Sequence, residues 1–505
     1  MPRYLLSHDI GTSADKATLF TLDGQIVKSA LSPYPVHYFN GNWAEQDAMD
    51  WWRAFCRGNR AVLEGVDPSE VAALSVSGQM MGCLPVDREG DPLRNVIIWT
   101  DGRAENETEL LKSKVRLESF YNIVGIRPSP NFTVEKVMWL MSHEPDVYEK
   151  THCFLSSKDF INLRLTGVFA TDPSDAGYTH AYDFYGRCWS DIILDAAGVD
   201  REKFPQVLEA GTLLGGVLPG IAEEAGLAPG TPVVEGVGDG RAACLGTGVL
   251  EPGDAYICLG TSSWVSRVTT SPAIDPLCRI QKGAFAQNTY NDGGTMQAGG
   301  LSMNWLKSQL ALHEQDIAAR EGGSPYDGIN RLAEASPAGA GGVLFLPYLM
   351  GERAPLWDMG AKGAFLGLKG ETTRGDIFRS VMEGVAMNLA TIYHIMRDIS
   401  EEFFTMRIVG GGSKSALWRQ IFADCFDMPI VKTNISDEAG SLGTAVVAGV
   451  GVGVYGSLAV VKEFHRVESI SEPIPENVER YRSLQPIFED AYLSLREINH
   501  RLGKL

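Results

Sequence analysis

Apolar runs that end in glycine-rich polar turns recur along the chain. In the clearest case, Pro232-Val233-Val234 leads into Gly236-Val237-Gly238-Asp239-Gly240, and residues with helical spacing follow. This pattern predicts a strand that ends just before Asp239, where a helix begins. The glycines allow a ligand to approach closely, and a carboxylate at a strand end can face a crevice. The same pattern also fits an aspartate that only caps the helix.

The N-terminal segment predicts three antiparallel strands. Its apolar stretches are separated by a Gly-Thr-Ser turn and then by an Asp-Gly hairpin signal. The turn at Gly11, Thr12 and Ser13 offers backbone N–H groups and two hydroxyls that suit phosphate oxygens. Asp9, just before the turn, is a candidate for holding Mg²⁺ through water. An ordinary hairpin with a polar tip would have the same sequence.

The chain has 505 residues, which is too long for a single core, so we expect two domains. The cluster Leu250-Glu251-Pro252-Gly253-Asp254 interrupts regular structure near mid-chain and is the best boundary. It predicts an N-terminal domain over residues 1–249 and a C-terminal domain over residues 250–505, with a hinge near residues 249–254.

The N-terminal layout repeats directly after this boundary. A predicted strand at residues 255–259, the turn Gly260-Thr261-Ser262 and a strand at residues 264–268 reproduce the order strand, Gly-Thr-Ser, strand. Two such turns, each opening one half of the chain, indicate duplicated domains that face one another across a phosphate chain. A chance match of three residues is the alternative.

Two further strand ends carry side chains that suit a polyhydroxylated ligand. The strand at residues 71–77 leads to Gln79, Met80 and Met81, and the strand at residues 96–99 ends in Trp99, Asp101 and Arg103. An aromatic ring can stack on a sugar, while a carboxylate and a guanidinium can hydrogen-bond its hydroxyls at such an edge. Alternatively, Asp101 caps a helix and Arg103 is solvated.

A third glycine-rich turn lies late in the chain. The predicted strand at residues 406–409 enters Gly410-Gly411-Gly412, and a helix follows Ser415. Such a backbone can lie flat against a purine and present a helix N-terminus. The tail from Glu476 to Leu502 is predicted to be helical with an interruption at Pro486.

Composition excludes several classes of partner. The formal net charge is −19, which disfavours nucleic acid and anionic membranes, although it permits a locally bound nucleotide. The eight cysteines are scattered without a C-x-x-C pair, which indicates buried thiols in a reducing, cytoplasmic setting. Residues 443–461 carry no charge, but their glycine content favours an interior helix and a turn over a membrane span. Walker A, H-E-x-x-H and G-x-S-x-G motifs do not occur.

Taken in order, these segments resemble the FGGY carbohydrate kinases and, within that family, the xylulokinase-like branch. The most specific are the Trp-x-Asp-Gly-Arg and Gly-Glu-Arg-x-Pro segments. The matching segments are residues 9–13, 43–47, 77–80, 99–103, 238–239, 259–262, 347–355, 410–413 and 438–443.

The resemblance implies an α/β fold of two ribonuclease-H-like domains of the actin/Hsp70 ATPase type, with a central cleft. It implies ATP and Mg²⁺ as cofactors, a sugar held mainly by the N-terminal domain, and Asp239 as the catalytic base. Mg²⁺ is expected near Asp9 and Asp239, through water. The cofactor contacts are expected from Gly11, Thr12, Ser13, Lys16, Gly260, Thr261, Ser262, Gly411, Gly412 and Ser415. The sugar contacts are expected from Gln79, Met80, Met81, Trp99, Asp101, Arg103 and Asp239.

Two positions depart from the xylulokinase pattern. Met81 stands where a histidine is usual, and Gly240 stands where an asparagine is usual. Both changes remove polar contacts to the sugar, and a site that hydrogen-bonds a hydroxyl discriminates strongly. The kinase chemistry is less affected, because Asp239 and both phosphate turns are intact.

The sequence therefore predicts ATP-dependent phosphorylation of a ketopentose such as D-xylulose to its 5-phosphate. Another ketose, a polyol or an aldonate is the first alternative. An actin- or Hsp70-like ATPase acting on a protein partner, and a sugar sensor with a dead active site, are the alternatives from other classes. The sequence leaves open whether the protein forms a homodimer.

Overall fold

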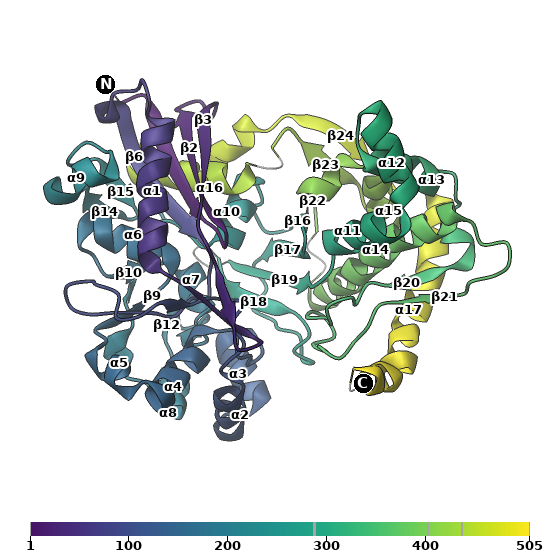
Figure 1. Cartoon of the computed structure of the whole chain (residues 1–505), viewed down its shortest axis with the longest axis horizontal. Helices are drawn as coiled ribbons and strands as arrows, with labels where there is room; N and C mark the ends of the chain where they lie inside the picture. The colour runs from purple at the N-terminus through teal and green to yellow at the C-terminus, as the bar shows by residue number, and fades with distance from the viewer. Residues whose placement is uncertain (1, 286–288, 401–402, 436–437, 504–505) are drawn as a thin grey trace. The chain divides into compact units, whose positions relative to one another are not determined.

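The computed structural model describes residues 2–285, 289–400, 403–435 and 438–503 (Figure 1). The chain divides into two units. The first unit comprises Met1–Leu250, Lys282–Tyr290 and Glu438–His465, and the second comprises Glu251–Gln281, Asn291–Asp437 and Arg466–Leu505. Two late segments thus return to the first unit. The predicted domain boundary between residues 249 and 250 stays a prediction. So does the assignment of the sugar to the N-terminal half and of the nucleotide to the C-terminal half.

A six-stranded sheet forms the centre of the first unit. Its strands, in spatial order, are β14 (Leu213–Gly216), β15 (Pro232–Val234), β6 (Val71–Gly78), β1 (Tyr4–Ile10), β2 (Ala14–Thr21) and β3 (Ile26–Pro33). The predicted N-terminal hairpins are confirmed, because β1 pairs antiparallel with β2, and β2 with β3. The pairs β1–β6 and β6–β15 are parallel. Every residue of β6 is buried, as expected for a central parallel strand.

Helices cover both faces of this sheet. Side chains alternate along β1, so consecutive residues face opposite sides. The ring of His8 lies 4.1 Å from that of Phe55 on α1 (Ala48–Val62), whereas a Cβ on Gly440 of α16 (Ala439–Gly451) would lie 3.7 Å from Asp9 Oδ2. Figure 1 shows α16, which comes late in the chain, beside these N-terminal strands. The face that carries Asp9 is therefore covered by a helix from residues beyond 438.

The helices α10 (Asp239–Gly246) and α16 cross at very short range. A Cβ on Gly443 would lie 2.1 Å from the carbonyl oxygen of Ala242, and one on Gly246 would lie 1.6 Å from that of Ala439. Only glycine fits at these two positions. The crossing explains the uncharged stretch that begins at residue 443, because its helix is an interior one. No helix of the described residues is long and apolar enough to cross a membrane.

The second unit repeats the central arrangement of the first. The strand β16 pairs antiparallel with β17 and parallel with β22, which is in turn parallel to β23. This reproduces the order of β2, β1, β6 and β15. The strands are β19 (Tyr290–Met296), β17 (Ser263–Thr269), β16 (Asp254–Leu259), β22 (Thr405–Val409), β23 (Ile430–Thr433) and β24 (Val467–Ser471). The predicted duplication is therefore visible in the topology as well as in the two turns.

The remaining elements are short strands and helices around these sheets. The other strands are β4 (His37–Phe39), β5 (Trp43–Gln46), β7 (Leu84–Val86), β8 (Val96–Ile97), β9 (Cys153–Leu155), β10 (Ala170–Thr171), β11 (Tyr182–Asp183), β12 (Cys188–Trp189), β13 (Gln206–Val207), β18 (Gln281–Ala284), β20 (Leu344–Leu346) and β21 (Ala364–Leu366). The other helices are α2 (Glu105–Lys114), α3 (Leu117–Val124), α4 (Thr133–His143), α5 (Pro145–Lys150), α6 (Ser157–Thr166), α7 (Pro173–Gly177), α8 (Asp191–Ala197), α9 (Pro219–Ala225), α11 (Gly300–Leu310), α12 (Leu312–Glu321), α13 (Pro325–Glu334), α14 (Arg374–Ile399), α15 (Ala416–Phe426) and α17 (Pro475–Leu502).

The predicted interruption of the C-terminal helix is wrong. The helix α17 continues through Pro486. Tyr481 and Phe488, on either side of the proline, are both buried and belong to the hydrophobic core of the second unit. Packing of this face outweighs the one hydrogen bond that proline removes, so the helix does not end there.

Candidate active site

Three parallel strands of the first unit end at one edge of the sheet, and the predicted catalytic groups lie there. Asp9 is at the end of β1, Gly78 ends β6, and Asp239 begins α10 shortly after β15. Gly78 and Gly238 form an isolated parallel bridge, which holds the last two segments together. Ligands of α/β proteins bind outside this carboxyl edge, so Asp9 and Asp239 are placed where a substrate can reach them.

The Asp239 carboxylate is suited to accept a proton near neutral pH. Surrounding protein atoms displace water and raise its pKa to about 7, and the negative charge of Asp9 adds to the rise. The N–H of Gly240 donates to Asp239 Oδ1 at 2.6 Å, and this hydrogen bond partly opposes the rise in pKa. The side chain nevertheless remains exposed, so a ligand can contact it. The mutual repulsion also shows that Asp9 and Asp239 lie near one another.

Asp9 sits among polar groups from several elements. Burial raises its pKa to about 6, and the nearby Asp15 adds to the rise. The hydroxyl of Ser77 donates to Asp9 Oδ1 at 3.3 Å and works in the opposite direction. Lys16 also lowers the pKa of Asp9, and its ammonium lies 2.5 Å from Glu438 Oε1. The sequence motif at 438–443 included Glu438 but suggested no role for it.

The turn at Gly11, Thr12 and Ser13 is held from below by side chains. The hydroxyl of Tyr34 donates to the carbonyl of Gly11, and Gln46 Nε2 donates to the carbonyl of Thr12 at 2.7 Å. The N–H of Gly11 is also engaged in the protein, where it donates to the carbonyls of Asp9 and Ala14 at 3.0 Å, so the opposite side of the turn is left for the other N–H groups and the hydroxyls. Gln79, expected at the sugar, donates instead to Gly11 O at 3.3 Å and to Gln46 Oε1 at 2.7 Å.

Trp99 connects the sugar-site segment to this turn. Its indole N–H donates to Thr12 Oγ1 at 2.9 Å. An indole N–H can only donate, so the Thr12 oxygen must accept in this bond. The Thr12 hydroxyl proton therefore remains available for another acceptor, such as a phosphate oxygen.

Asp101 and Arg103 form a buried ion pair instead of facing an open site. Two nitrogens of the guanidinium contact the carboxylate at 2.7–3.1 Å, and both side chains are fully buried. The guanidinium also lies 2.8 Å from Glu45 Oε1 and 3.9 Å from the ring of Trp43. Both charges are satisfied inside the protein, so this geometry favours a structural role over direct contact with a sugar.

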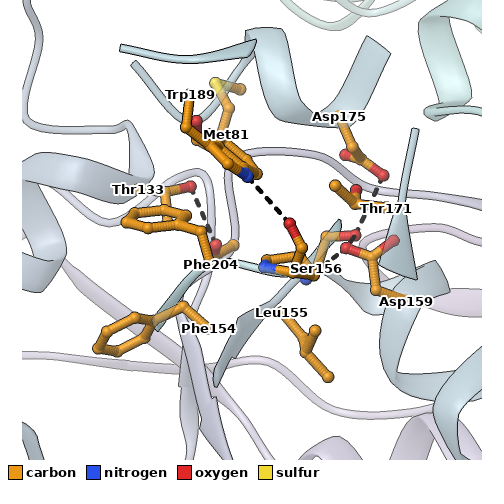
Figure 2. Close-up of a pocket in the computed structure, with 13 residues that line it drawn as sticks. Met81, Thr133, Phe154, Leu155, Ser156, Asp159, Thr171, Asp175, Trp189 and Phe204 are labelled. Atoms are coloured by element: carbon orange, nitrogen blue, oxygen red, sulfur yellow. Dashed lines mark hydrogen bonds between the residues drawn. The ribbon is translucent and has the colours of Figure 1, made fainter. Parts of the chain in front are cut away.

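A small cavity lies beside Met81 and the start of α4 (Figure 2). It measures about 20 Å³, and Met81, Ser156, Trp189 and Asp175 are among the residues that line it. Ser156 Oγ lies 3.0 Å from Asp175 Oδ2, while Asp175 Oδ1 has no hydrogen-bond partner in the described residues. The cavity has room for about one water molecule, which excludes it as a sugar site.

In the second unit, the turn Gly260-Thr261-Ser262 packs on the start of α11. The N–H of Gly300 donates to Gly260 O at 2.7 Å, and that of Leu301 donates to Thr261 O at 3.0 Å. The carbonyls of this turn are thus engaged in the protein, as they are in the first turn. This arrangement again leaves N–H groups and hydroxyls on the opposite side.

The turn at 410–415 shows which of its residues can meet a ligand. Gly410 has a φ of +85°, and a Cβ on Gly412 would lie 2.8 Å from both Leu259 and Trp418. A Cβ on Gly411, in contrast, would have no atom of the described residues within 4 Å, so Gly411 borders open space there. Ser415 caps α15, where its oxygen accepts from Trp418 N, and it also lies 2.9 Å from Asn330 Oδ1. Its hydroxyl is therefore used inside the protein.

The donor set fits a weakly chelated Mg²⁺ better than a tightly caged metal. The described residues contain no group of three or more histidine, cysteine or carboxylate side chains placed to hold a metal ion. Mg²⁺ bound with a nucleotide commonly uses one or two carboxylates, water and phosphate oxygens. Asp9 and Asp239 can supply the carboxylates.

Comparison with known proteins agrees with this geometry. Residues 4–246 match the model of the N-terminal domain of the FGGY family of carbohydrate kinases, and residues 255–452 match that of the C-terminal domain. A crystal structure of ligand-bound xylulose kinase from Lactobacillus acidophilus is similar with a TM-score of 0.91 at 25% identity, over 98% of both chains. The predicted fold of two ribonuclease-H-like domains is confirmed by this likeness.

Curated relatives span nearly the whole chain. The xylulose kinase of Escherichia coli is 30% identical, over 95% of this chain and 96% of its own. The gluconokinase of Bacillus subtilis is 28% identical, over 97% of this chain and 95% of its own. The strand-end carboxylates, the paired Gly-Thr-Ser turns and these full-length matches lead to one conclusion. The chain belongs to the FGGY family of carbohydrate kinases and is an ATP-dependent sugar kinase.

Proposed function

We propose that this kinase phosphorylates a ketopentose, D-xylulose, at its 5-hydroxyl, with Asp239 as the general base. The observation that carries the proposal is the exposed Asp239 carboxylate at the carboxyl edge of the parallel strands, where α10 begins, and the raised pKa of this group agrees with it. A base with a pKa near the working pH is best matched to removing a hydroxyl proton as the phosphoryl group is transferred.

We assign the phosphates of ATP to the two Gly-Thr-Ser turns. In each turn the protein engages carbonyl oxygens, which favours N–H and O–H groups for the phosphates. Lys16 stays a further candidate, although its pairing with Glu438 reduces its availability. Gly411, which borders open space, is assigned to the adenosine, and Gly412 supports it from behind.

Asp9 and Asp239 are assigned to Mg²⁺, through water. When bound, the ion would neutralise charge on the phosphate oxygens during transfer. The two carboxylates repel one another, so a divalent cation beside both would relieve that repulsion.

A neutral sugar is favoured over a sugar acid by the state of the nearby cations. Arg103 is paired with Asp101 through two nitrogens, and its third guanidinium nitrogen lies 2.8 Å from Glu45 Oε1. Lys136, the other buried cation of these segments, donates to main-chain carbonyls. Neither is free to bind a substrate carboxylate, which would need a charge-assisted partner when desolvated.

A sugar acid such as gluconate remains the second candidate. It is favoured by the gluconokinase relative, whose identity to this chain is close to that of the xylulose kinase. Met81 and Gly240, which replace polar residues of the xylulokinase pattern, also weaken the case for D-xylulose.

The experiment is ADP release with ATP and Mg²⁺ against a panel of ketoses, polyols and aldonates. Stimulation chiefly by D-xylulose, with the 5-phosphate as product, supports the proposal. Stimulation chiefly by an aldonate contradicts it and selects the second candidate, and stimulation chiefly by a polyol contradicts both candidates. The same protein, sedimented with and without substrates, decides whether it forms a homodimer. The cytoplasmic location expected from the cysteines stays a prediction.

A further inference from the structure

Lys136 on α4 is a buried ammonium that holds three separate segments. Its Nζ donates to the carbonyl oxygens of Met81 and Ile98, each at 2.8 Å, and to that of Asn131. An ammonium has three N–H groups, so these bonds use all of its donors. The side chain is completely buried.

The three carbonyls all adjoin predicted sugar contacts. Met81 is itself one of them, and Ile98 directly precedes Trp99. Asn131 lies in the turn before α4. Its Nδ2 donates to the carbonyl of Trp99 at 3.1 Å and to that of Asp101 at 3.2 Å, so this turn is also bonded to the second strand end. The first strand end and the second are therefore joined through the beginning of α4.

Thr133 completes this arrangement. Its hydroxyl donates to the carbonyl of Gly82 at 3.1 Å, next to the bond from Lys136 to Met81. Met81 has a φ of +64°, in the left-handed region that a side chain other than glycine rarely adopts. Such a conformation persists only when surrounding bonds impose it. We call Asn131, Thr133 and Lys136 the α4 clamp.

Placing a charged ammonium at this buried position carries a desolvation cost. Burial lowers the pKa of Lys136 to about 7, since its charge loses water and gains only neutral carbonyls as direct partners. An apolar side chain of the same length would fill the volume without that cost. The ammonium adds something that an apolar chain lacks, because it fixes the direction of three carbonyls at once.

We propose that the α4 clamp positions the sugar site, with Lys136 as its principal positioning residue. The clamp sets the strained Met81 turn and the Trp99 segment at a fixed separation, so the sugar meets a preformed surface. Lys136 does not itself touch the sugar. The inference rests on the proposed sugar kinase function and on Met81 and Trp99 as predicted sugar contacts, but it does not depend on which sugar is bound.

The test is the substitution Lys136→Met, which keeps the length of the side chain and removes all three donors. We expect the KM for the sugar to rise about ten- to hundred-fold, because small misplacements of binding groups have effects of that size. The KM for ATP should change less than the KM for the sugar, since the clamp meets the phosphate turn indirectly, through the bond from Trp99 to Thr12. Both constants are measured with the sugar that the wild type turns over fastest.

The matched control is Leu140→Ala, on the same helix and fully buried, which destabilises the fold without touching the clamp. It should lower the melting temperature and leave the sugar KM unchanged. Asn131→Ala is the second clamp variant; Asn131 is only half-buried, so it should fold, and its sugar KM should rise as well.

An unchanged sugar KM in folded Lys136→Met overturns the proposal, and so do equal changes in both KM values. If Lys136→Met does not fold, Asn131→Ala decides by the same two criteria. Failure of the proposed function appears elsewhere, in the sugar preference of the wild type. A preference for an aldonate would reject D-xylulose and leave the clamp test intact.

Discussion

Mild acidification should inactivate this kinase through protonation of Asp239. The pKa of Asp239 is raised from 3.8 to about 7, and a general base must be ionised to accept a proton. At about one pH unit below its pKa only about a tenth of the base is ionised, so kcat/KM should fall about ten-fold between about pH 7 and about pH 6, and more steeply below about pH 6, where Asp9 is also protonated. An aspartate with an ordinary pKa would show no loss in this range.

The assay is ADP release as a function of pH, with ATP varied at saturating sugar. Under these conditions kcat/KM for ATP reports the enzyme before nucleotide and metal bind. The acid limb of kcat should lie at lower pH, because a cation bound beside Asp9 and Asp239 stabilises the ionised form. Asp9→Asn should also move the kcat/KM limb to lower pH, since the charge of Asp9 raises the pKa of Asp239. Asp239→Asn should reduce kcat by at least about 10²-fold and remove the part of the acid limb that begins near pH 7.

Stability separates loss of the base from loss of the fold. The folded-state pKa of Asp239 lies above its unfolded value, so ionisation of Asp239 destabilises the folded state. This penalty is complete above about pH 7 and disappears below about pH 4. Asp239→Asn should therefore melt slightly higher than the wild type at about pH 8, by a modest amount because the group is exposed. Near wild-type turnover in Asp239→Asn, or an acid limb centred near pH 4, would refute the assignment.

Two further substitutions probe contacts on which the site depends. Trp99→Phe removes the indole N–H that fixes the Thr12 oxygen as an acceptor, so we expect kcat in the ADP-release assay to fall by about ten-fold, the size of one lost hydrogen bond. Gly443→Ala places a Cβ 2.1 Å from the carbonyl of Ala242, so it should reduce the free energy of unfolding in urea by about 1–3 kcal/mol or prevent folding.

Each of these substitutions has a control in the first unit. Trp189→Phe removes an indole N–H that donates to Pro205 O, away from the phosphate turn, and should leave kcat unchanged. Gly220→Ala, on α9, adds a Cβ that no atom of the described part of the chain approaches within 4 Å, and it should not destabilise the fold. Equal losses of kcat in Trp99→Phe and Trp189→Phe would contradict the role of Trp99. A Gly443→Ala protein as stable as Gly220→Ala would contradict the tight crossing.

Local patterns in the sequence predicted the elements that carry the site. The position of Asp239 after a buried strand, and the two Gly-Thr-Ser turns between paired strands, follow from hydrophobic period and turn chemistry. These signals act over a few residues, so they can be recognised without knowing what packs against them. The roles assigned to these residues in catalysis stay predictions.

Tertiary structure alone decided the partners of the charged and small residues. Arg103 had the composition of a sugar contact, yet it pairs with Glu45 and Asp101 and stacks on Trp43. Lys136 bonds to two strand ends, at Met81 and Ile98, that lie far from it in the sequence. The return of α16 to the first unit, and its glycine contact with α10, also has no local signal. A short stretch of sequence encodes its own backbone preference, but the group that meets a buried charge or a bare backbone is set only when distant segments pack together.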